Sequence, residues 1–215
     1  TQNVEFALFS LDLFDDIVLG NQEYLDLILS DAFTHETYYM GTVDENNQAN
    51  FYDGMIRVVG PGGEELVKYP PQDYAKHIAE RVEPWSYLKF PYLKDVGWEG
   101  FVDGKDSGVY CCTPLSRLNA SDGLATPKAQ EHYERFYETL GSEKINGRYT
   151  PVHHRLATHW ARLIEILYSA ERMVELIDDP EITSQDVRQV VTNTPSEGIG
   201  SVEAPRGTLT HHYKT

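Results

Sequence analysis

Residues 150–180 read TPVHHRLATHWARLIEILYSAERMVELIDDP, and this stretch decides the fold of the chain. Thr150-Pro151 places a capping hydroxyl before a first-turn proline, and Pro180 ends the pattern, so we expect a helix over residues 152–178. Its apolar positions recur at three- and four-residue steps and spread well past a single face. A helix that is apolar over so much of its circumference is a central one, covered on several sides.

The neighbouring segments predict further helices. Thr126-Pro127 repeats the same start signal and indicates a helix that runs to about Gly141. A third, short helix is expected around residues 184–191. Near the N-terminus, apolar side chains recur at helical spacing up to Gly20, and a second short helix follows.

Between these helices the pattern switches to that of strands. Tight turns separate three β-prone runs, which predict an antiparallel meander. The runs are residues 37–43, 50–59 and 66–69. A short helix over about 72–82 and an extended, irregular stretch over 95–112 should follow.

The expected fold class is therefore α+β, mainly helical with a small antiparallel β meander near residues 36–69. We expect a single unit without an internal domain boundary. Its parts are residues 1–35 (helices), 36–112 (β-rich and irregular) and 113–215 (helical, ending in a loop and a strand).

Composition excludes several classes of function. The 215 residues carry 18 Lys plus Arg against 34 Asp plus Glu, a formal net charge of −16, which disfavours binding to nucleic acid or to an anionic membrane surface. No apolar run approaches the roughly 20 residues that span a bilayer. Cys111 and Cys112 are adjacent, which excludes a loop-closing disulfide and a Cys-x-x-Cys site. His154 and His159 do not share a helix face, so no metal-ligating residues are assigned.

The most informative segment for chemistry lies near the C-terminus, at residues 197–213. It indicates a glycine-flanked loop that enters a strand. Pro205 fixes the backbone, Gly207 permits a close approach, and Arg206 between them is a permanent cation with planar donors. This arrangement can aim a guanidinium into a pocket; the alternative is a surface arginine paired with Glu203.

These residues also carry a resemblance to a known family. Glu203-Ala204-Pro205-Arg206-Gly207 resembles a motif of the large subunit of nickel–iron hydrogenases, and the residues that follow it continue in the same style. Two further stretches are similar to that family, and a third is similar to its soluble, cytoplasmic members linked to NAD(P) or a deazaflavin. The three stretches are, in that order, residues 114–119, 161–167 and 83–92.

The resemblance implies an enzyme acting on H2, reversibly and in the cytoplasm. Arg206 would be catalytic, as a nearby base or proton-orienting group in H2 cleavage. Ala204, Pro205 and Arg206 would contact the cofactor, a Ni–Fe(CN)2CO centre in the parent enzyme. A role as a fixed positive charge suits a guanidinium better than a role as a general base, since its pKa lies far above the operating pH. The implied partners are the iron–sulfur small hydrogenase subunit together with diaphorase-type electron-transfer subunits.

The sequence also departs from that family. Two Cys-x-x-Cys pairs hold the metals in the family, and this chain has neither. We therefore expect a central segment of a longer subunit, inactive by itself and with no metal centre bound; the missing initial Met and the strand-like end agree with this. The alternatives are a metal-free complex I relative that helps to form a quinone site, and a non-catalytic acidic assembly or binding module.

Overall fold

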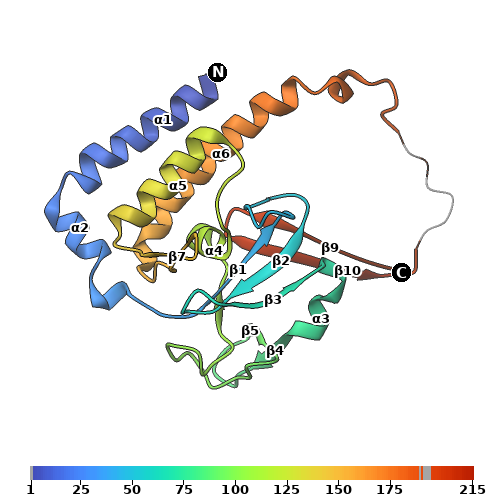
Figure 1. Ribbon diagram of the computed structural model, residues 1–215. Helices are drawn as coiled ribbons and strands as arrows, with labels where there is room; N and C mark the ends of the chain where they lie inside the picture. The colour runs from blue at the N-terminus through green and yellow to red at the C-terminus, as the bar shows by residue number, and fades with distance from the viewer. Residues whose placement is uncertain (1, 189, 191–194) are drawn as a thin grey trace.

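The computed structural model describes residues 2–188, 190 and 195–215, and Figure 1 shows their arrangement. Helices and strands both contribute, so the expected α+β class is confirmed. The helices are α1 (Gln2–Phe14), α2 (Gln22–Ile28), α3 (Tyr74–His77), α4 (Pro114–Ala120), α5 (Pro127–Thr139) and α6 (Thr158–Ile177). The strands are β1 (Tyr38–Val43), β2 (Met55–Val59), β3 (Glu65–Tyr69), β4 (Ile78–Val82), β5 (Lys89–Leu93), β6 (Tyr110–Cys111), β7 (Lys144–Ile145), β8 (Arg148–Tyr149), β9 (Glu197–Ala204) and β10 (Gly207–Lys214).

The helical part of the fold is organised around α6. This helix packs against α1, α4 and α5, as expected for a helix that is apolar over much of its circumference. Trp160 on α6 is 1% exposed, and its ring contacts Phe136 of α5 edge-on at 5.2 Å and lies 5.9 Å from that of Phe14. None of the helices in the described ranges is both long enough and apolar enough to cross a membrane.

The expected meander is confirmed and gains one strand. β1, β2 and β3 pair in antiparallel fashion, and β6 adds to the free edge of β1 in parallel. The short β6 comes from the stretch expected to be irregular. A separate hydrophobic cluster fills this part of the fold; its fully buried members include Ile56, Val58 and Leu93.

Helix α4 connects the two parts. All seven of its residues are buried, and it contacts both β1 and α6. Thr113 caps the helix by accepting a hydrogen bond from the backbone N–H of Ser116, and Pro114 occupies the first turn. In Figure 1 it lies at the centre of the molecule, between the helices and the strands.

The C-terminal segment is a hairpin rather than a loop followed by a strand. β9 and β10 pair along their whole lengths, from Ala204–Gly207 to Glu197–Lys214. The hairpin lies against β1 and α4. The backbone N–H of Glu203 donates a 2.9 Å hydrogen bond to the carbonyl of Phe51, which attaches β9 to the loop after β1.

Three expected helices differ from the structure. Residues 72–82 form only the short α3 and then strand β4, which pairs with β5. Residues 152–154 are not helical and α6 starts at Thr158, because His154 pairs as an isolated bridge with Thr34. Residues 184–188 and 190 form no helix, and residues 189 and 191 of that expected helix lie outside the described residues.

Candidate functional site

The turn of the β9–β10 hairpin carries the residues that the sequence singles out. Pro205 and Arg206 form the two-residue turn, and Gly207 follows with a φ of +148°. A Cβ added to Gly207 would lie 2.0 Å from the carbonyl oxygen of Cys112. Only glycine permits this approach, which confirms the expected role of Gly207 and presses the start of β10 against the strand-to-helix turn before α4.

A buried arginine fastens the hairpin to the body of the protein. Arg117 on α4 donates two hydrogen bonds of 2.6 Å to the carboxylate of Glu165 on α6. Its Nη1 also donates to Glu203 Oε2 at 3.1 Å and to the carbonyl of Ala204 at 2.8 Å. Glu203 Oε1 accepts hydrogen bonds from the backbone N–H and the hydroxyl of Thr42, at 2.7 and 2.9 Å. We call Arg117, Glu165 and Glu203 the Arg117 cluster.

The electrostatics of the Arg117 cluster are those of a desolvated ion pair with one carboxylate in excess. The side chains of Arg117, Glu165 and Glu203 are 3%, 7% and 1% exposed. Burial raises the pKa of Glu165, and the guanidinium beside it offsets part of that rise. Burial acts to lower the pKa of Arg117, but its hydrogen bonds and charge interactions with Glu165 and Glu203 outweigh burial, so that pKa is raised.

A cavity of about 360 Å³ opens beside this cluster. The Arg117 guanidinium lies over the ring of Phe51, 5.4 Å from its centroid, and forms part of the wall. Ala204 and Pro205 line the same cavity, whereas Arg206 does not. The complete lining is Phe51, Arg117, Arg162, Glu165, Ile166, Ser169, Glu203, Ala204 and Pro205.

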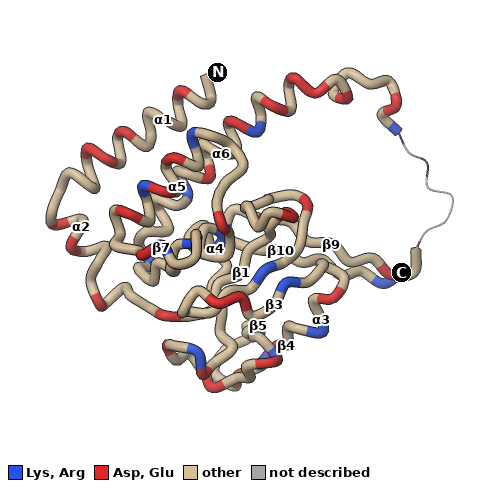
Figure 2. The backbone as a smooth tube through the Cα atoms, viewed as in Figure 1, with Lys and Arg blue, Asp and Glu red and all other residues tan. Residues whose placement is uncertain are grey.

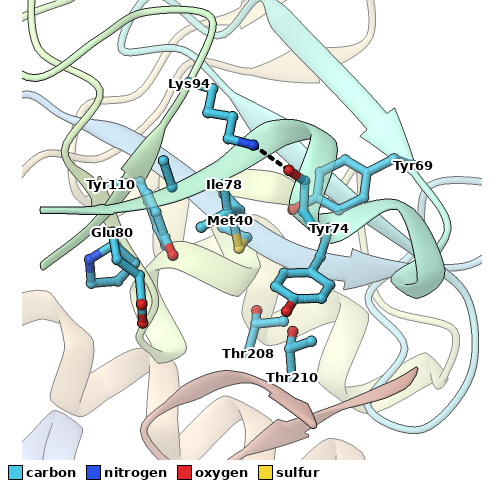
Figure 3. A pocket seen from close by; sticks show the side chains of 12 residues that line it. Met40, Tyr69, Tyr74, Ile78, Glu80, Lys94, Tyr110, Thr208 and Thr210 are labelled. Carbon is cyan, nitrogen blue, oxygen red and sulfur yellow. Dashed lines mark hydrogen bonds between the residues drawn. The ribbon is translucent and has the colours of Figure 1, made fainter. Parts of the chain in front are cut away.

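A second cavity of about 570 Å³ borders β10 (Figure 3). Thr208 and Thr210 of β10 form its floor in the view of Figure 3, and Tyr74 stands beside them. The hydroxyl of Tyr69, another lining residue, is buried and has no hydrogen-bond partner among the described residues. Lys94 at the rim donates to the carbonyl of Ala75.

The cysteines do not form a metal site in the described residues. No three His, Cys, Asp or Glu side chains within residues 2–188, 190 and 195–215 are grouped so that they could hold a metal ion. Burial raises the pKa of the Cys112 thiol to about 12, which disfavours the thiolate that iron requires. Cys111 is buried beside it and its Sγ lies 3.3 Å from the Thr113 hydroxyl. This part of the chain therefore does not fit an iron–sulfur cluster.

Comparison with known proteins shows similarity to subunits of hydrogenases. No protein-family model matches the chain. The iron–sulfur subunit of an F420-non-reducing hydrogenase from Archaeoglobus profundus is 45% identical over 212 residues, which are 99% of this chain and 42% of the relative. The beta subunit of the NAD-reducing hydrogenase HoxS from Cupriavidus necator is 38% identical over 179 residues, 81% of this chain and 33% of that subunit.

Among solved structures, a chain of an NAD+-reducing [NiFe]-hydrogenase in the H2-reduced state matches with a TM-score of 0.80 and 31% identity. The match covers 98% of this chain and 43% of that one. The chain is similar to hydrogenase subunits over most of its length. It spans less than half the length of the relatives that it matches.

The names of these hydrogenase relatives correct two expectations. The expected identity and function, a central segment of the catalytic large subunit, is contradicted because the Archaeoglobus relative is named an iron–sulfur subunit. The same name contradicts the cofactor expectation, which was a Ni–Fe(CN)2CO centre in the parent enzyme and no bound group in this chain. The solved structure is that of a [NiFe] enzyme, but the match does not assign that centre to the aligned chain. The contact of Ala204, Pro205 and Arg206 with a Ni–Fe centre loses its basis.

The structure brings together only part of the predicted site. Ala204 and Pro205 line a cavity, but Arg206 is exposed at the tip of the hairpin. The alternative, Arg206 paired with Glu203, is wrong, since Glu203 pairs with Arg117. Sequence reasoning missed the other two members of the Arg117 cluster. Glu165 within the apolar run LIEIL was the available signal, because a charge on a buried helix face needs a partner.

Proposed function

We propose that this chain is part of a subunit of a multisubunit hydrogenase, an oxidoreductase acting on H2. Within that subunit its task is to hold Arg206 at a fixed position at the tip of the β9–β10 hairpin. The similarity to hydrogenase subunits over almost the whole chain supports the first statement. The Arg117 cluster supports the second, because it fastens β9 three residues before Arg206.

Ordering a surface arginine costs free energy. A free arginine loses considerable rotamer and backbone entropy when it binds, and a preorganised turn reduces that loss. Here Pro205 restricts the turn and the close approach of Gly207 to Cys112 fixes the other side. Within the described residues, Arg206 has no ion-pair partner and is exposed, so its planar donors are available to an anionic group elsewhere in the complex.

The partners and electron acceptor follow from the relatives and are part of the same proposal. The chain would work next to a catalytic subunit, within a complex that passes electrons between H2 and an acceptor such as NAD. Reduction of a diffusing nicotinamide cofactor suits a cytoplasmic location. The described residues do not fit an iron–sulfur cluster, so the proposal leaves electron transfer to other parts of the complex.

The test is substitution of Arg206 in the assembled, purified hydrogenase. Arg206→Gln should reduce H2-dependent reduction of a viologen dye several-fold, because the charge-assisted hydrogen bonds that Arg206 makes to an anionic group of the complex are lost. Arg206→Lys should recover only part of the rate, because lysine keeps the charge but not the planar fork.

Arg172→Gln is the matched control, since Arg172 is an exposed arginine of α6 that pairs only with Glu175 in the described residues. It should leave the rate unchanged. Size-exclusion chromatography must show that every variant assembles. An Arg206→Gln complex that assembles and retains the parent rate within about twofold would exclude the proposed role of Arg206.

A further inference from the structure

Helix α1 has two apolar sides, and only one of them is covered. Ala7 and Leu11 are each 1% exposed and belong to the helical core that contains α6. A second set of large apolar side chains follows the helix at steps of three, four and four residues, which places them along one line of its surface. This α1 stripe consists of Phe6, Phe9 and Leu13 of α1 and of Ile17 in the π-helical segment Asp15–Leu19 that continues it, exposed by 66%, 59%, 46% and 52%.

A second exposed apolar feature lies near the C-terminal end of α1. A mostly apolar hollow of about 300 Å³ lies where α1 passes into α2, with Tyr24 and Leu27 of α2 at its wall. In Figure 1, α1 and α2 form the outer flank of the helical layer, with α5 and α6 on their inner side. Exposed apolar area of this kind marks a surface that another polypeptide covers.

The negative charge around the α1 stripe indicates that the covering polypeptide is basic. Residues 1–31 contain seven Asp and Glu and no Lys or Arg. Exposed Glu5, Asp12 and Asp16 each precede a stripe residue directly, so they form a row of carboxylates along one flank of the α1 stripe. Figure 2 shows acidic positions along α1 and α2 and no basic ones. A second copy of the chain would bring two such rows together, and the like charges would repel.

The lengths of the hydrogenase relatives indicate where a covering helix comes from. The matched region is 42% of the Archaeoglobus relative and 43% of the solved chain, so more than half of each has no counterpart in these 215 residues. We propose that the α1 stripe is the docking surface for a helix from that remaining part of the full-length subunit. The docking helix carries an apolar stripe flanked by Lys or Arg on the side that faces Glu5, Asp12 and Asp16. This inference rests on the proposed function only in placing the chain within a longer hydrogenase subunit.

Zero-length carbodiimide crosslinking of the full-length, assembled hydrogenase tests the docking directly. Mass spectrometry should find Asp12 or Asp16 joined to a lysine of the same polypeptide outside the present 215 residues. The Asp73–Lys76 pair, 2.8 Å apart with an exposed lysine and a half-buried aspartate, is the internal positive control. Three outcomes would each overturn the proposal. Asp12 and Asp16 could be linked only to another subunit, or only to a second copy of this subunit. They could also be linked to no lysine although the control pair reacts.

Substitutions provide a second readout that does not depend on H2 turnover. Phe9→Ser/Leu13→Ser should lower the melting temperature of the full-length subunit by several degrees, whereas Tyr52→Ser/Tyr87→Ser, at side chains 85% and 97% exposed, should not. Equal melting temperatures for the two double variants would contradict the docking.

A charge-reversal variant covers the case in which the apolar variant fails to fold. Asp12→Lys/Asp16→Lys keeps the α1 stripe and alters only exposed carboxylates that form no ion pair in the described residues. Its melting temperature should fall more at low than at high ionic strength, because salt screens the repulsion from the basic flank. A rise, or no change with salt, would overturn the proposal. Arg206→Gln should leave these crosslinks and melting temperatures unchanged, so failure of the proposed function remains distinguishable.

Discussion

Arg117 is a single cation between two buried carboxylates, and this determines what the Arg117 cluster does for the protein. A buried ion pair adds little net stability, because desolvation offsets most of the attraction. Removing one partner, by contrast, leaves an uncompensated charge and costs about 3–5 kcal/mol. The cluster therefore acts as a strict geometric constraint: α4, α6 and β9 are stable only in the arrangement that keeps Arg117 paired with both Glu165 and Glu203.

A half-buried histidine, His153, gives a prediction at the same scale. Burial lowers the pKa of His153 from its usual 6.5, and a 2.6 Å hydrogen bond joins its Nδ1 to the Tyr39 hydroxyl. The unfolded state thus binds the proton more readily than the folded state, so stability falls as the pH drops below about 6.5 toward the lowered value. His153→Gln should reduce this loss in melting temperature between pH 7.5 and 5 relative to the parent chain. Exposed His211→Gln should leave the loss unchanged, and equal pH profiles for parent and His153→Gln would contradict the prediction.

Individual residues of the candidate site were predictable only where the backbone decides their role. The role of Gly207 is predictable, because a glycine two residues after a proline indicates an unusual turn. The pairing of Glu203 was not, since Arg117 lies 86 residues away in the sequence. Local patterns carry no information about which distant charge a buried carboxylate meets.

Among the structural elements, the β9–β10 hairpin is positioned by one close contact, that of Gly207 with the carbonyl of Cys112. Gly207→Ala should destabilise the protein by about 1–3 kcal/mol, since the added methyl group would overlap the carbonyl of Cys112 and the φ of +148° disfavours alanine. Gly200→Ala, in the same hairpin with open space around its Cβ position, should change stability by less than about 0.5 kcal/mol. Urea unfolding followed by circular dichroism measures both, and similar losses for the two variants would show that the contact with Cys112 is not limiting.

The elements that sequence patterns misjudged have a common cause. Residues 78–82 are expected to end a helix but pair with residues 89–93, and the ring of Trp85 packs against Phe90 of this small sheet. Residues 152–154 carry a helix start signal, yet hydrogen bonds of His153 and His154 to Tyr39 and Thr34 hold them extended. In both cases tertiary contacts outweigh local propensity, which differs by less than about 1 kcal/mol per residue.

At the scale of the whole molecule, α4 links the two hydrophobic clusters: Leu115 and Leu118 belong to the helical cluster, and the other side of α4 is hydrogen-bonded to β1. Ser116 accepts a 2.8 Å hydrogen bond from the backbone N–H of Met40 in β1, while Asn119 donates to the carbonyl of Val152 on the helical side. The clusters should therefore unfold together. Fluorescence of Trp160 and hydrogen exchange of β1–β2 peptides should give the same urea midpoint, and two separate midpoints would contradict this coupling.

Sequence patterns predict the main helices and strands better than the way these elements pack together. Helix α6, helix α5 and the three-stranded meander follow from periodicity and turn residues, and all are present. The docking of the hairpin against β1 and the insertion of α4 between sheet and helices were not predicted, because both depend on contacts between segments far apart in the chain. The candidate site lies where these segments meet.

The complete burial of α4 also has a consequence for how this sequence can change over evolutionary time. A residue in contact with β1, α6 and β10 cannot be replaced without adjustment in several segments at once. Residues 114–120 should therefore diverge more slowly among descendants of this chain than the hairpin tip that they support. The tip can acquire a different role while the helix beneath it remains almost unaltered.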